Sequence, residues 1–370
     1  MRAITLVPGE QGSARLDDVP EPDASMGSIL VEAVAVGVCG TDLEIVSGSY
    51  GWAPAEHASE RCDAVHGRPA KPPGRERLVL GHESLGRVLE APDGAGVTPG
   101  DLVVGIVRRP DPVPCPSCAV GEWDMCRNGR YTERGIKELD GYMSERWRIE
   151  PEFAVRIDPE LGAAGVLMEP ASILAKAWEQ VERIGRRAHW EPRRALVTGA
   201  GPIGLLAALM GVQRGLEVHV LDRVTEGPKP QLVADLGATY HHGTVKDAVE
   251  GPDMVIECTG VGQLVLDAIE ALGPGGIVCL TGVSSGGRTI PVDAGALNRE
   301  LVLENNVIVG SVNANRRHYQ QAAEALAKAD RAWLDRLITR RVPLDRWHEA
   351  LERRPDDVKV TIQLAAADSA

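Results

Sequence analysis

Hydrophobic and polar residues alternate, or apolar residues form short runs, along the first half of the chain. From Ser28 the sequence alternates and then becomes apolar up to Val38, which predicts a strand ending at Gly37-Val38-Cys39-Gly40. Glycine and proline turns, rather than helices, separate further strand-like runs. These runs cover 78–80, 87–90, 102–107 and 142–149. The first half is therefore predicted to be mostly β.

The pattern changes near Met168-Glu169-Pro170, after which apolar residues at helical spacing predict a helix over 172–184. Strands and helices then alternate, which is typical of a parallel sheet with helices on both faces. The predicted strands are 195–198, 217–221, 253–258, 276–281, 307–312 and 358–364, and the predicted helices are 202–214, 230–236, 319–328 and 332–338. We expect an α/β protein with a β-rich domain over 1–176, an inserted α/β domain over 177–312 and a return to the first domain over 313–370.

The composition indicates a folded protein that acts on small molecules. The 370 residues are 44% apolar and 25% charged, which excludes a disordered chain. A net charge of −13 argues against nucleic acid or an anionic membrane as the main partner. The apolar stretches are too short to span a bilayer, and the first residues lack the pattern of a signal peptide. We therefore expect a cytoplasmic protein with no membrane segment.

A glycine-rich turn follows the predicted strand 195–198 and opens the helix 202–214. Its sequence, Gly199-Ala200-Gly201-Pro202-Ile203-Gly204, matches the dinucleotide-binding fingerprint in the required strand–turn–helix context. The first glycine permits the tight turn, the second lets the backbone approach the pyrophosphate, and the third lets helix and strand pack closely. The turn therefore predicts a Rossmann-type nucleotide site.

Asp222 ends the next predicted strand, near the spacing at which a carboxylate binds the adenosine ribose. This favours NAD. The adjacent Arg223 could instead approach the 2′-phosphate of NADP, so NADP is possible, and Asp222 could also simply end its strand.

Two separated residues carry the chemistry of a catalytic zinc site. Cys39 and His82 each lie at the end of a β-region segment and offer the thiolate and imidazole that Zn²⁺ binds. Glu83 and Glu169 could complete the set as carboxylates. Each residue alone is weak evidence, because a lone cysteine on a strand is usually a core residue.

Three more cysteines form a compact lobe. In a chain expected in the cytoplasm, seven cysteines favour metal binding or catalysis over disulfides. Cys115, Cys118 and Cys126 offer three thiolates for a closed tetrahedral zinc site, which needs a fourth ligand. Asp111 is the preferred fourth ligand and Asp124 the second choice; a lobe that binds no metal stays an alternative.

The segment 56–73 is poor in apolar residues and ends in a proline cluster, so it is predicted to be a surface loop near the entrance of the site. His57, Cys62 and His66 could bind metal in principle. Because the ligand set above is complete without them, we expect this loop to alter access rather than to supply a ligand.

These motifs resemble, in their order, those of the zinc-dependent medium-chain dehydrogenases, and in particular the glucose (aldose) 1-dehydrogenase branch. The matching segments are Cys39-Gly40-Thr41-Asp42, Gly81-His82-Glu83, Pro99-Gly100-Asp101, the cysteine lobe, Gly141-Tyr142-Met143, Glu169-Pro170, the glycine-rich turn and Gly310-Ser311-Val312-Asn313. The resemblance implies a GroES-like catalytic domain, an inserted Rossmann domain and a dimer or tetramer.

The resemblance also implies residue roles. Cys39 and His82 would ligate the catalytic zinc, with Glu83 and Glu169 joining directly or through water. Thr41 would contact the reacting hydroxyl and relay its proton. Glu133, Glu169 and Asn313 would hold the sugar, and Asn313 and Thr259 would also contact the nucleotide.

Three features depart from the family pattern. The first cysteine of the lobe falls on Asp111, Val107 and Leu303 stand where archaeal glucose dehydrogenases carry Asn and His at the sugar, and the segment 56–73 is inserted. The motifs therefore specify the type of reaction more closely than they specify the substrate.

The resemblance implies hydride transfer from C1 of glucose or a related aldose to NAD(P), which gives an aldonolactone. Three alternatives remain open: a polyol or secondary-alcohol dehydrogenase with the same zinc and cofactor, an inactive nucleotide-binding protein, and a structural zinc module, which leaves the glycine-rich turn unexplained.

Overall fold

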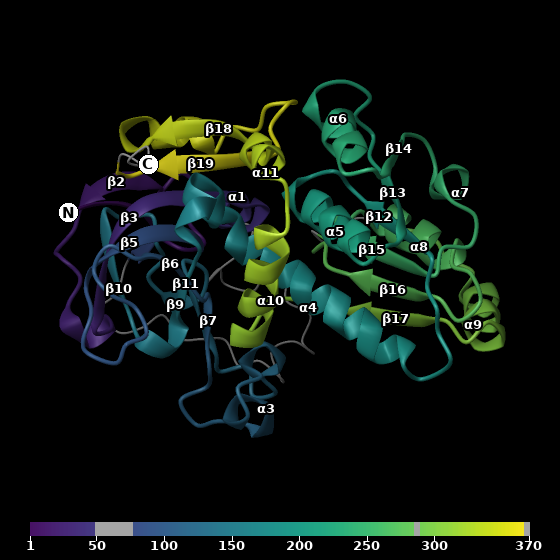
Figure 1. Ribbon diagram of the computed structural model, residues 1–370, viewed down its shortest axis with the longest axis horizontal. Helices are drawn as coiled ribbons and strands as arrows, with labels where there is room; N and C mark the ends of the chain where they lie inside the picture. Colours follow the sequence, from purple (N-terminus) through teal and green to yellow (C-terminus); the bar gives the residue numbers. More distant parts are fainter. Residues whose placement is uncertain (49–76, 285–288, 366–370) are drawn as a thin grey trace. The chain divides into compact units, whose positions relative to one another are not determined.

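The largest sheet of the first unit joins strands from both ends of the chain. A computed structural model describes residues 1–48, 77–284 and 289–365. The seven-stranded sheet has the order β11-β6-β5-β3-β19-β18, with β10 also paired to β3 (Figure 1). Its strands are β3 (Ile29–Val38), β5 (Glu83–Glu90), β6 (Leu102–Gly105), β10 (Arg146–Ile149), β11 (Ala154–Arg156), β18 (Ile338–Pro343) and β19 (Lys359–Gln363). This arrangement confirms the β-rich first half, and β18 and β19 join the sheet from the C-terminal part of the chain.

Smaller elements surround this sheet. Two three-stranded sheets consist of β1 (Arg2–Leu6), β2 (Arg15–Asp18) and β4 (Leu78–Val79), and of β7 (Arg108–Arg109), β8 (Thr132–Arg134) and β9 (Glu138–Leu139). The helices are α1 (Gly40–Val46), α3 (Pro116–Ala119), α10 (Arg316–Ala327) and α12 (Trp347–Ala350), with the short 3-10 helices η1 (Ala24–Met26), η2 (Trp123–Met125), η3 (Pro151–Phe153), η4 (Pro159–Leu167) and η5 (Leu344–Arg346).

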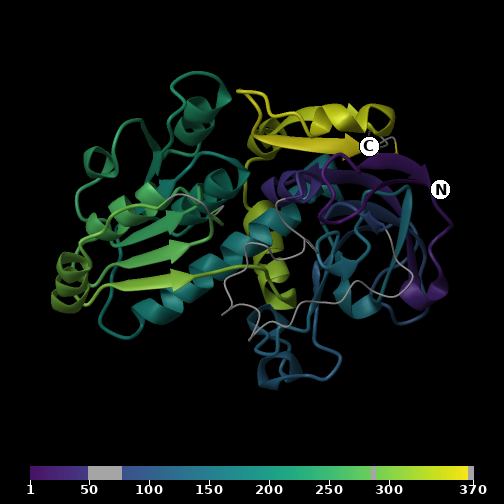
Figure 2. The same cartoon turned by 180° about the vertical axis from the view of Figure 1, so that it is seen from behind.

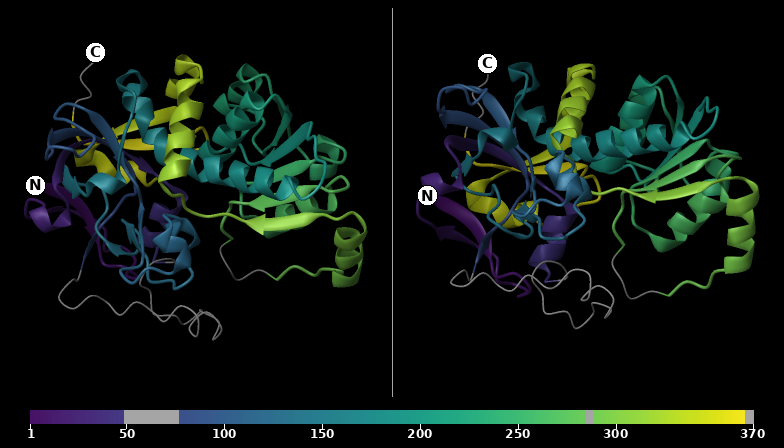
Figure 3. Two further views of the ribbon diagram at one scale, coloured as in Figure 1. Left: turned by 60° about the horizontal axis from the view of Figure 1, so that its bottom comes forward. Right: turned by 90° about the horizontal axis from the view of Figure 1, so that it is seen from below.

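The second unit is built on a six-stranded parallel sheet in the order β14-β13-β12-β15-β16-β17, the doubly wound order that the alternating pattern predicts (Figure 2). Its strands are β12 (Arg194–Thr198), β13 (Glu217–Leu221), β14 (Thr239–His241), β15 (Met254–Glu257), β16 (Ile277–Leu280) and β17 (Val307–Gly310). Its helices are α4 (Met168–Gly185), α5 (Pro202–Gln213), α6 (Pro228–Asp235), α7 (Val245–Ala248), α8 (Gly262–Glu270), α9 (Ala294–Leu303) and α11 (Arg331–Leu337). Figure 3 shows β17 along one edge of this sheet.

The division of the chain into units is discontinuous. The first unit comprises 1–169, 313–323 and 338–370, and the second comprises 170–312 and 324–337. The inserted segment 56–73, including His57, Cys62 and His66, lies outside the described residues.

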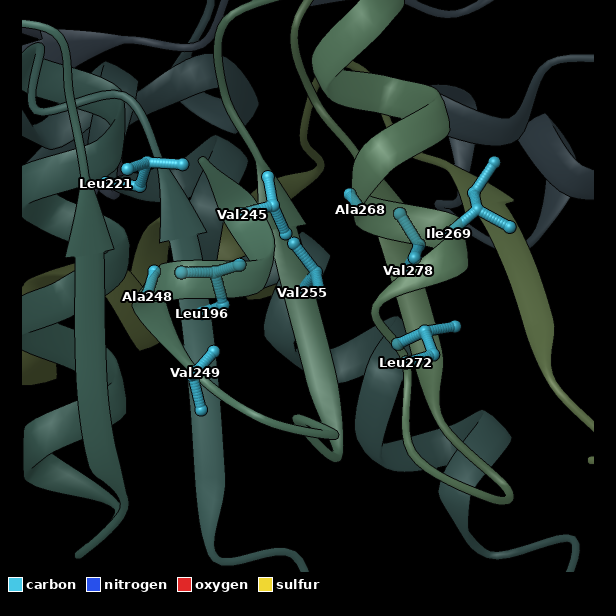
Figure 4. Close-up of a cluster of buried hydrophobic side chains, with 10 residues drawn as sticks. All are labelled: Leu196, Leu221, Val245, Ala248, Val249, Val255, Ala268, Ile269, Leu272 and Val278. Atoms are coloured by element: carbon cyan, nitrogen blue, oxygen red, sulfur yellow. The ribbon is translucent and has the colours of Figure 1, made fainter. Parts of the chain in front are cut away.

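One face of the parallel sheet carries a buried apolar core. Leu196 pairs with Val255, and Val255 pairs with Val278, so their side chains lie on the same face. Residues of α7 and α8, such as Val245 and Ala268, cover them (Figure 4). This packing fixes β12, whose carboxyl end carries the glycine-rich turn.

We expect Leu196→Ala to lower the free energy of unfolding of the second unit by about 2–5 kcal/mol, because it removes fully buried apolar atoms and leaves a cavity. Urea unfolding followed by circular dichroism measures the change. Leu303→Ala is the matched control in the same unit, since Leu303 is 69% exposed. Equal unfolding curves for the two variants would contradict this account of the core.

Candidate functional site

Three predicted zinc ligands meet where β3 and β5 lie side by side. Cys39 follows β3 directly, His82 precedes β5, and Glu83 is the first residue of β5. Gly37 of β3 pairs with Glu83, which brings both strand ends to the same place. One ligand atom from each of Cys39, His82 and Glu83 lies within 4.8 Å of the others.

Asp42, on the first turn of α1, orients this cluster. Its Oδ2 accepts a hydrogen bond from the Cys39 amide at 2.8 Å, and its Oδ1 lies 3.3 Å from His82 Nδ1. A carboxylate beside one imidazole nitrogen fixes the ring and directs the other nitrogen to a metal. Sequence reasoning gave Asp42 no role, although its position three residues after Cys39 fits a capping residue that reaches back to the start of its helix.

Glu83 has a further partner that sequence reasoning missed. The Lys359 ammonium, on β19, donates to Glu83 Oε1 at 2.7 Å and Oε2 at 2.6 Å. Both side chains are buried. No short-range motif signals Lys359, because 276 positions of the sequence separate the two residues.

Glu169 lies in the first turn of α4 and is buried within electrostatic range of the same cluster. Burial raises the pKa of its carboxyl to about 7, His82 and Lys359 oppose this shift, and the charge of Glu83 adds to it. Burial alone would lower the pKa of His82, but Asp42 and Cys39 outweigh burial and raise it well above its ordinary value. The site therefore concentrates anionic groups that a bound cation would stabilise.

This donor set fits zinc. A thiol, an imidazole and carboxylates are the ligands that catalytic zinc sites use. Thr41 lies two residues after Cys39 in the first turn of α1 and is half-buried.

Two residues predicted to hold the sugar contact each other. Glu133 Oε1 accepts hydrogen bonds from Asn313 Nδ2 at 2.6 Å and from Arg108 Nε and Nη2 at 3.0 and 2.9 Å. Asn313 has a φ of 61°, a left-handed conformation that asparagine tolerates better than most residues. Arg108, which sequence reasoning did not assign, therefore fixes the predicted sugar carboxylate.

The three thiols of the cysteine lobe also lie close together. Sulfur atoms of Cys115, Cys118 and Cys126 lie within 4.8 Å of one another. The Arg127 amide donates to Cys115 Sγ at 3.4 Å, and this and other backbone amides lower the pKa of Cys115 to about 6. A thiolate at neutral pH suits a metal ligand.

Neither candidate for the fourth lobe ligand belongs to the thiol cluster as described. Asp111 accepts hydrogen bonds from the Val113 amide and from Asn128 Nδ2, both at 2.8 Å. Asp124 Oδ1 accepts one from Asn315 Nδ2 at 2.7 Å. Asp111 as the fourth ligand stays a prediction.

The glycine-rich turn has the backbone that its fingerprint requires. Gly199 has a φ of 92°, and a Cβ at Gly204 would overlap the Gly199 carbonyl oxygen, so helix α5 packs tightly on the turn. A Cβ at Gly201, the N-cap of α5, would meet no atom within 4 Å among the described residues. This open approach to a helix N-terminus suits a phosphate group. Pro202 and Ile203 form the first turn of α5.

Asp222 supports the turn directly. Its Oδ2 accepts from the Ala200 amide at 2.7 Å and from Lys229 Nζ at 3.2 Å, and its Oδ1 accepts from the Val224 amide at 3.1 Å. Burial alone would raise the pKa of Asp222, but these partners lower it. Arg223 beside it is exposed. Sequence reasoning missed Lys229.

Thr259, the remaining nucleotide candidate, is held by a buried carboxylate. Glu257 Oε1 accepts from the Thr259 amide at 2.8 Å, and Oε2 accepts from the Gly260 amide at 3.0 Å. Thr259 also packs close to Gly199, so the two loops of the nucleotide site support each other.

Known proteins match both parts of the chain. The family model for the GroES-like domain of alcohol dehydrogenases matches residues 25–159, and the model for the glucose dehydrogenase C-terminus matches residues 162–364. The glucose 1-dehydrogenase of Methanocella arvoryzae is 39% identical, with 99% of this chain and 100% of the relative covered. This chain belongs to the zinc-dependent medium-chain dehydrogenases, in the glucose 1-dehydrogenase branch.

Further relatives agree with this placement. The glucose 1-dehydrogenase of Thermoproteus tenax is 38% identical over 98% of this chain and 99% of its own. The glucose dehydrogenase of Haloferax mediterranei, solved in complex with NADP, Zn and gluconolactone, superposes on this dehydrogenase with a TM-score of 0.87 at 32% identity. That comparison covers 99% of this chain and 100% of the other. Among the described residues, no helix of this dehydrogenase is both long and apolar enough to cross a bilayer.

We expect Cys118→Ser to remove the zinc of the lobe without removing the catalytic zinc, because the two thiol-containing clusters are separate. Metal analysis of purified protein should fall from two zinc ions per chain to one, with a lower melting temperature, since structural zinc contributes to folding. Cys258→Ser, outside both clusters, is the control. Retention of both zinc ions in Cys118→Ser would refute the assignment.

Proposed function

We propose that this dehydrogenase oxidises C1 of glucose or a related aldose. The C1–H bond breaks, its hydride passes to the nicotinamide of NAD(P), and the C1 hydroxyl loses its proton, which gives an aldonolactone and NAD(P)H. The observation that carries the proposal is the cluster of Cys39, His82 and Glu83, with Glu169 in electrostatic range. The Haloferax relative, whose structure contains NADP, Zn and gluconolactone, supports the same reaction.

Cys39, His82, Glu83 and Glu169 would hold the zinc ion, with the two carboxylates joining directly or through water. When bound, zinc is a Lewis acid that makes loss of a hydroxyl proton feasible near neutral pH. Asp42, whose Oδ1 lies 3.3 Å from His82 Nδ1, would fix the His82 ring and keep the ligand geometry ready. The Thr41 hydroxyl would accept the proton of the reacting sugar hydroxyl and pass it on.

Glu133, Asn313 and Glu169 would hold the sugar. The hydrogen bonds described for Glu133 all use Oε1, so Oε2 would accept from a sugar hydroxyl. Arg108 holds this carboxylate in place. Fixed positioning of this kind holds a reacting atom in line with its acceptor.

The nucleotide would bind at the turn formed by Gly199, Gly201, Pro202, Ile203 and Gly204, with Asp222, Arg223, Thr259 and Asn313 as further contacts. We propose that NAD is preferred and NADP is used as well. Lys229 partly neutralises Asp222, which reduces the repulsion between that carboxylate and a 2′-phosphate.

The cysteine lobe would hold a second, structural zinc through Cys115, Cys118, Cys126 and Asp111. Asp111 would have to exchange its contacts with Val113 and Asn128 for the metal.

A polyol or secondary alcohol is the second candidate substrate. It is favoured by Val107, which is buried, and by Leu303, which is exposed, because neither offers the hydrogen bonds of the Asn and His that they replace. The same zinc and cofactor would serve this reaction. An inactive nucleotide-binding protein is disfavoured, since Cys39, His82 and Glu83 lie together in one cluster.

We also propose a homo-oligomer, a dimer or a tetramer. The edge strand β17 and its surroundings expose Val283, Ile308 and Val312, and such apolar edges favour burial against another chain. Cytoplasmic location is proposed because the clustered thiols need a reducing compartment to stay available for metal.

A turnover screen with aldoses, polyols and secondary alcohols, each with NAD and NADP, tests the reaction. We expect aldoses to give the highest kcat/KM and Cys39→Ala to abolish turnover while keeping the fold and most of the NAD affinity. Cys279→Ser, a buried cysteine outside both clusters, controls for loss of a thiol. Full activity in Cys39→Ala would end this proposal, and a preference for polyols would favour the second candidate.

We expect Asp222→Ala to raise the ratio of kcat/KM for NADP to that for NAD by about 10-fold, which corresponds to about 1.4 kcal/mol of discrimination. Both cofactors lose the support that Asp222 gives to the Ala200 amide, so the ratio isolates the contact with the ribose. Asp235→Ala, on α6, should keep the wild-type ratio. An unchanged ratio in Asp222→Ala would show that this carboxylate does not face the ribose.

A further inference from the structure

A buried ion pair lies beside the proposed zinc ligands. Lys359 and Glu83 are each only 1% exposed, and the ammonium donates to both carboxylate oxygens, at 2.7 and 2.6 Å. A third bond runs from Lys359 Nζ to the Val38 carbonyl at 3.2 Å. An ammonium group has three donors, so these three acceptors use its whole capacity.

The sheet creates this pair across an intervening strand. Glu83 lies on β5 and Lys359 on β19, and β3 runs between them. Gly37 of β3 pairs with Glu83, and a Cβ at position 37 would overlap Glu83 Oε2. Glycine at this position therefore leaves the space in which the Glu83 carboxylate meets Lys359.

The pair has a direct consequence for the charge around a metal. A buried carboxylate without a partner would be strongly destabilised, and a nearby cation would attract it. Lys359 supplies that compensation, so Glu83 has to give up two short charge-assisted hydrogen bonds before it can bind a metal. Cys39, His82 and Glu169 would then be the residues that hold a zinc ion directly.

We propose that Lys359 is a positioning residue that holds Glu83 beside the catalytic metal rather than on it. With Cys39, His82 and Glu169 as the residues that would hold the metal, a position would remain for the reacting hydroxyl, as a catalytic zinc requires. This inference rests on the proposed function, because it assumes a metal bound through Cys39 and His82.

Cobalt(II) in place of zinc provides a readout that does not depend on turnover. Its d–d absorption is intense in four-coordinate sites and weaker in five-coordinate ones. The spectrum of each protein is taken as the difference from Cys39→Ala, which removes the contribution of the cysteine lobe. Release of cobalt to a chelator is timed in the same samples.

In Lys359→Met, the freed Glu83 carboxylate should join the metal. We expect the d–d bands to weaken and cobalt release to slow by about 10-fold, a typical size for outer-shell effects on metal affinity. Lys359→Arg, which keeps a buried cation, should stay close to the wild type. A merely structural role for Lys359 predicts the opposite, faster release with unchanged bands, and this result would overturn the proposal.

Two further proteins keep the test decisive if Lys359→Met folds poorly. Glu83→Gln alone should leave the wild-type cobalt spectrum unchanged, since Glu83 is not a resting ligand; a changed spectrum overturns the proposal. Lys359→Met combined with Glu83→Gln should restore intense bands, because the freed carboxylate is gone.

Failure of the proposed function gives a different result. If the wild type and Cys39→Ala have identical cobalt spectra, no metal binds at Cys39, and the proposed function fails together with the role of Lys359. If they differ and Lys359→Met matches the wild type in both readouts, only the role of Lys359 is refuted.

Discussion

The pairing of β3 with β5 and β19 is the constraint on which the catalytic cluster depends. The register sets Gly37 opposite Glu83, and Val38 opposite Val360. Cys39 follows β3 and His82 precedes β5, so their side chains meet only in this register. A shift by one residue would turn alternate side chains to the other face of the sheet and separate the ligands. The buried polar groups reinforce the register, because Lys359 reaches Glu83 and Asp42 reaches His82 only when the strands are aligned.

Short-range sequence patterns predicted much of the fold and part of the candidate site. The strand 217–221 and the turn at Gly199 follow from apolar periodicity and from glycine spacing, both of which are short-range properties of a sequence. Cys39 and His82 could be named because thiol and imidazole at strand ends are chemically distinctive. The family resemblance added Glu133 and Asn313, which no local pattern would have selected.

The parts of the fold and of the site that the sequence did not predict depend on contacts between segments that are distant in the sequence. Lys359 and Arg108 resemble ordinary surface residues in the sequence, and only the folded sheets show that they neutralise Glu83 and Glu133. Short strands such as β14, with three residues, carry too little periodicity to be recognised. The contacts of Asp111 were also not predictable, because a carboxylate in a loop can accept from nearby amides as readily as it can bind a metal.

The position of Lys359 near the end of the chain has a consequence for biosynthesis. Glu83 emerges from the ribosome 276 residues before its partner. At about 5–20 residues per second, this delay is roughly 14–55 s, during which the nascent β3 and β5 lack β19. Most of the second unit, 170–312, is translated within that interval and can fold first. The sheet that carries the metal ligands is thus completed last, although its first strands are made first.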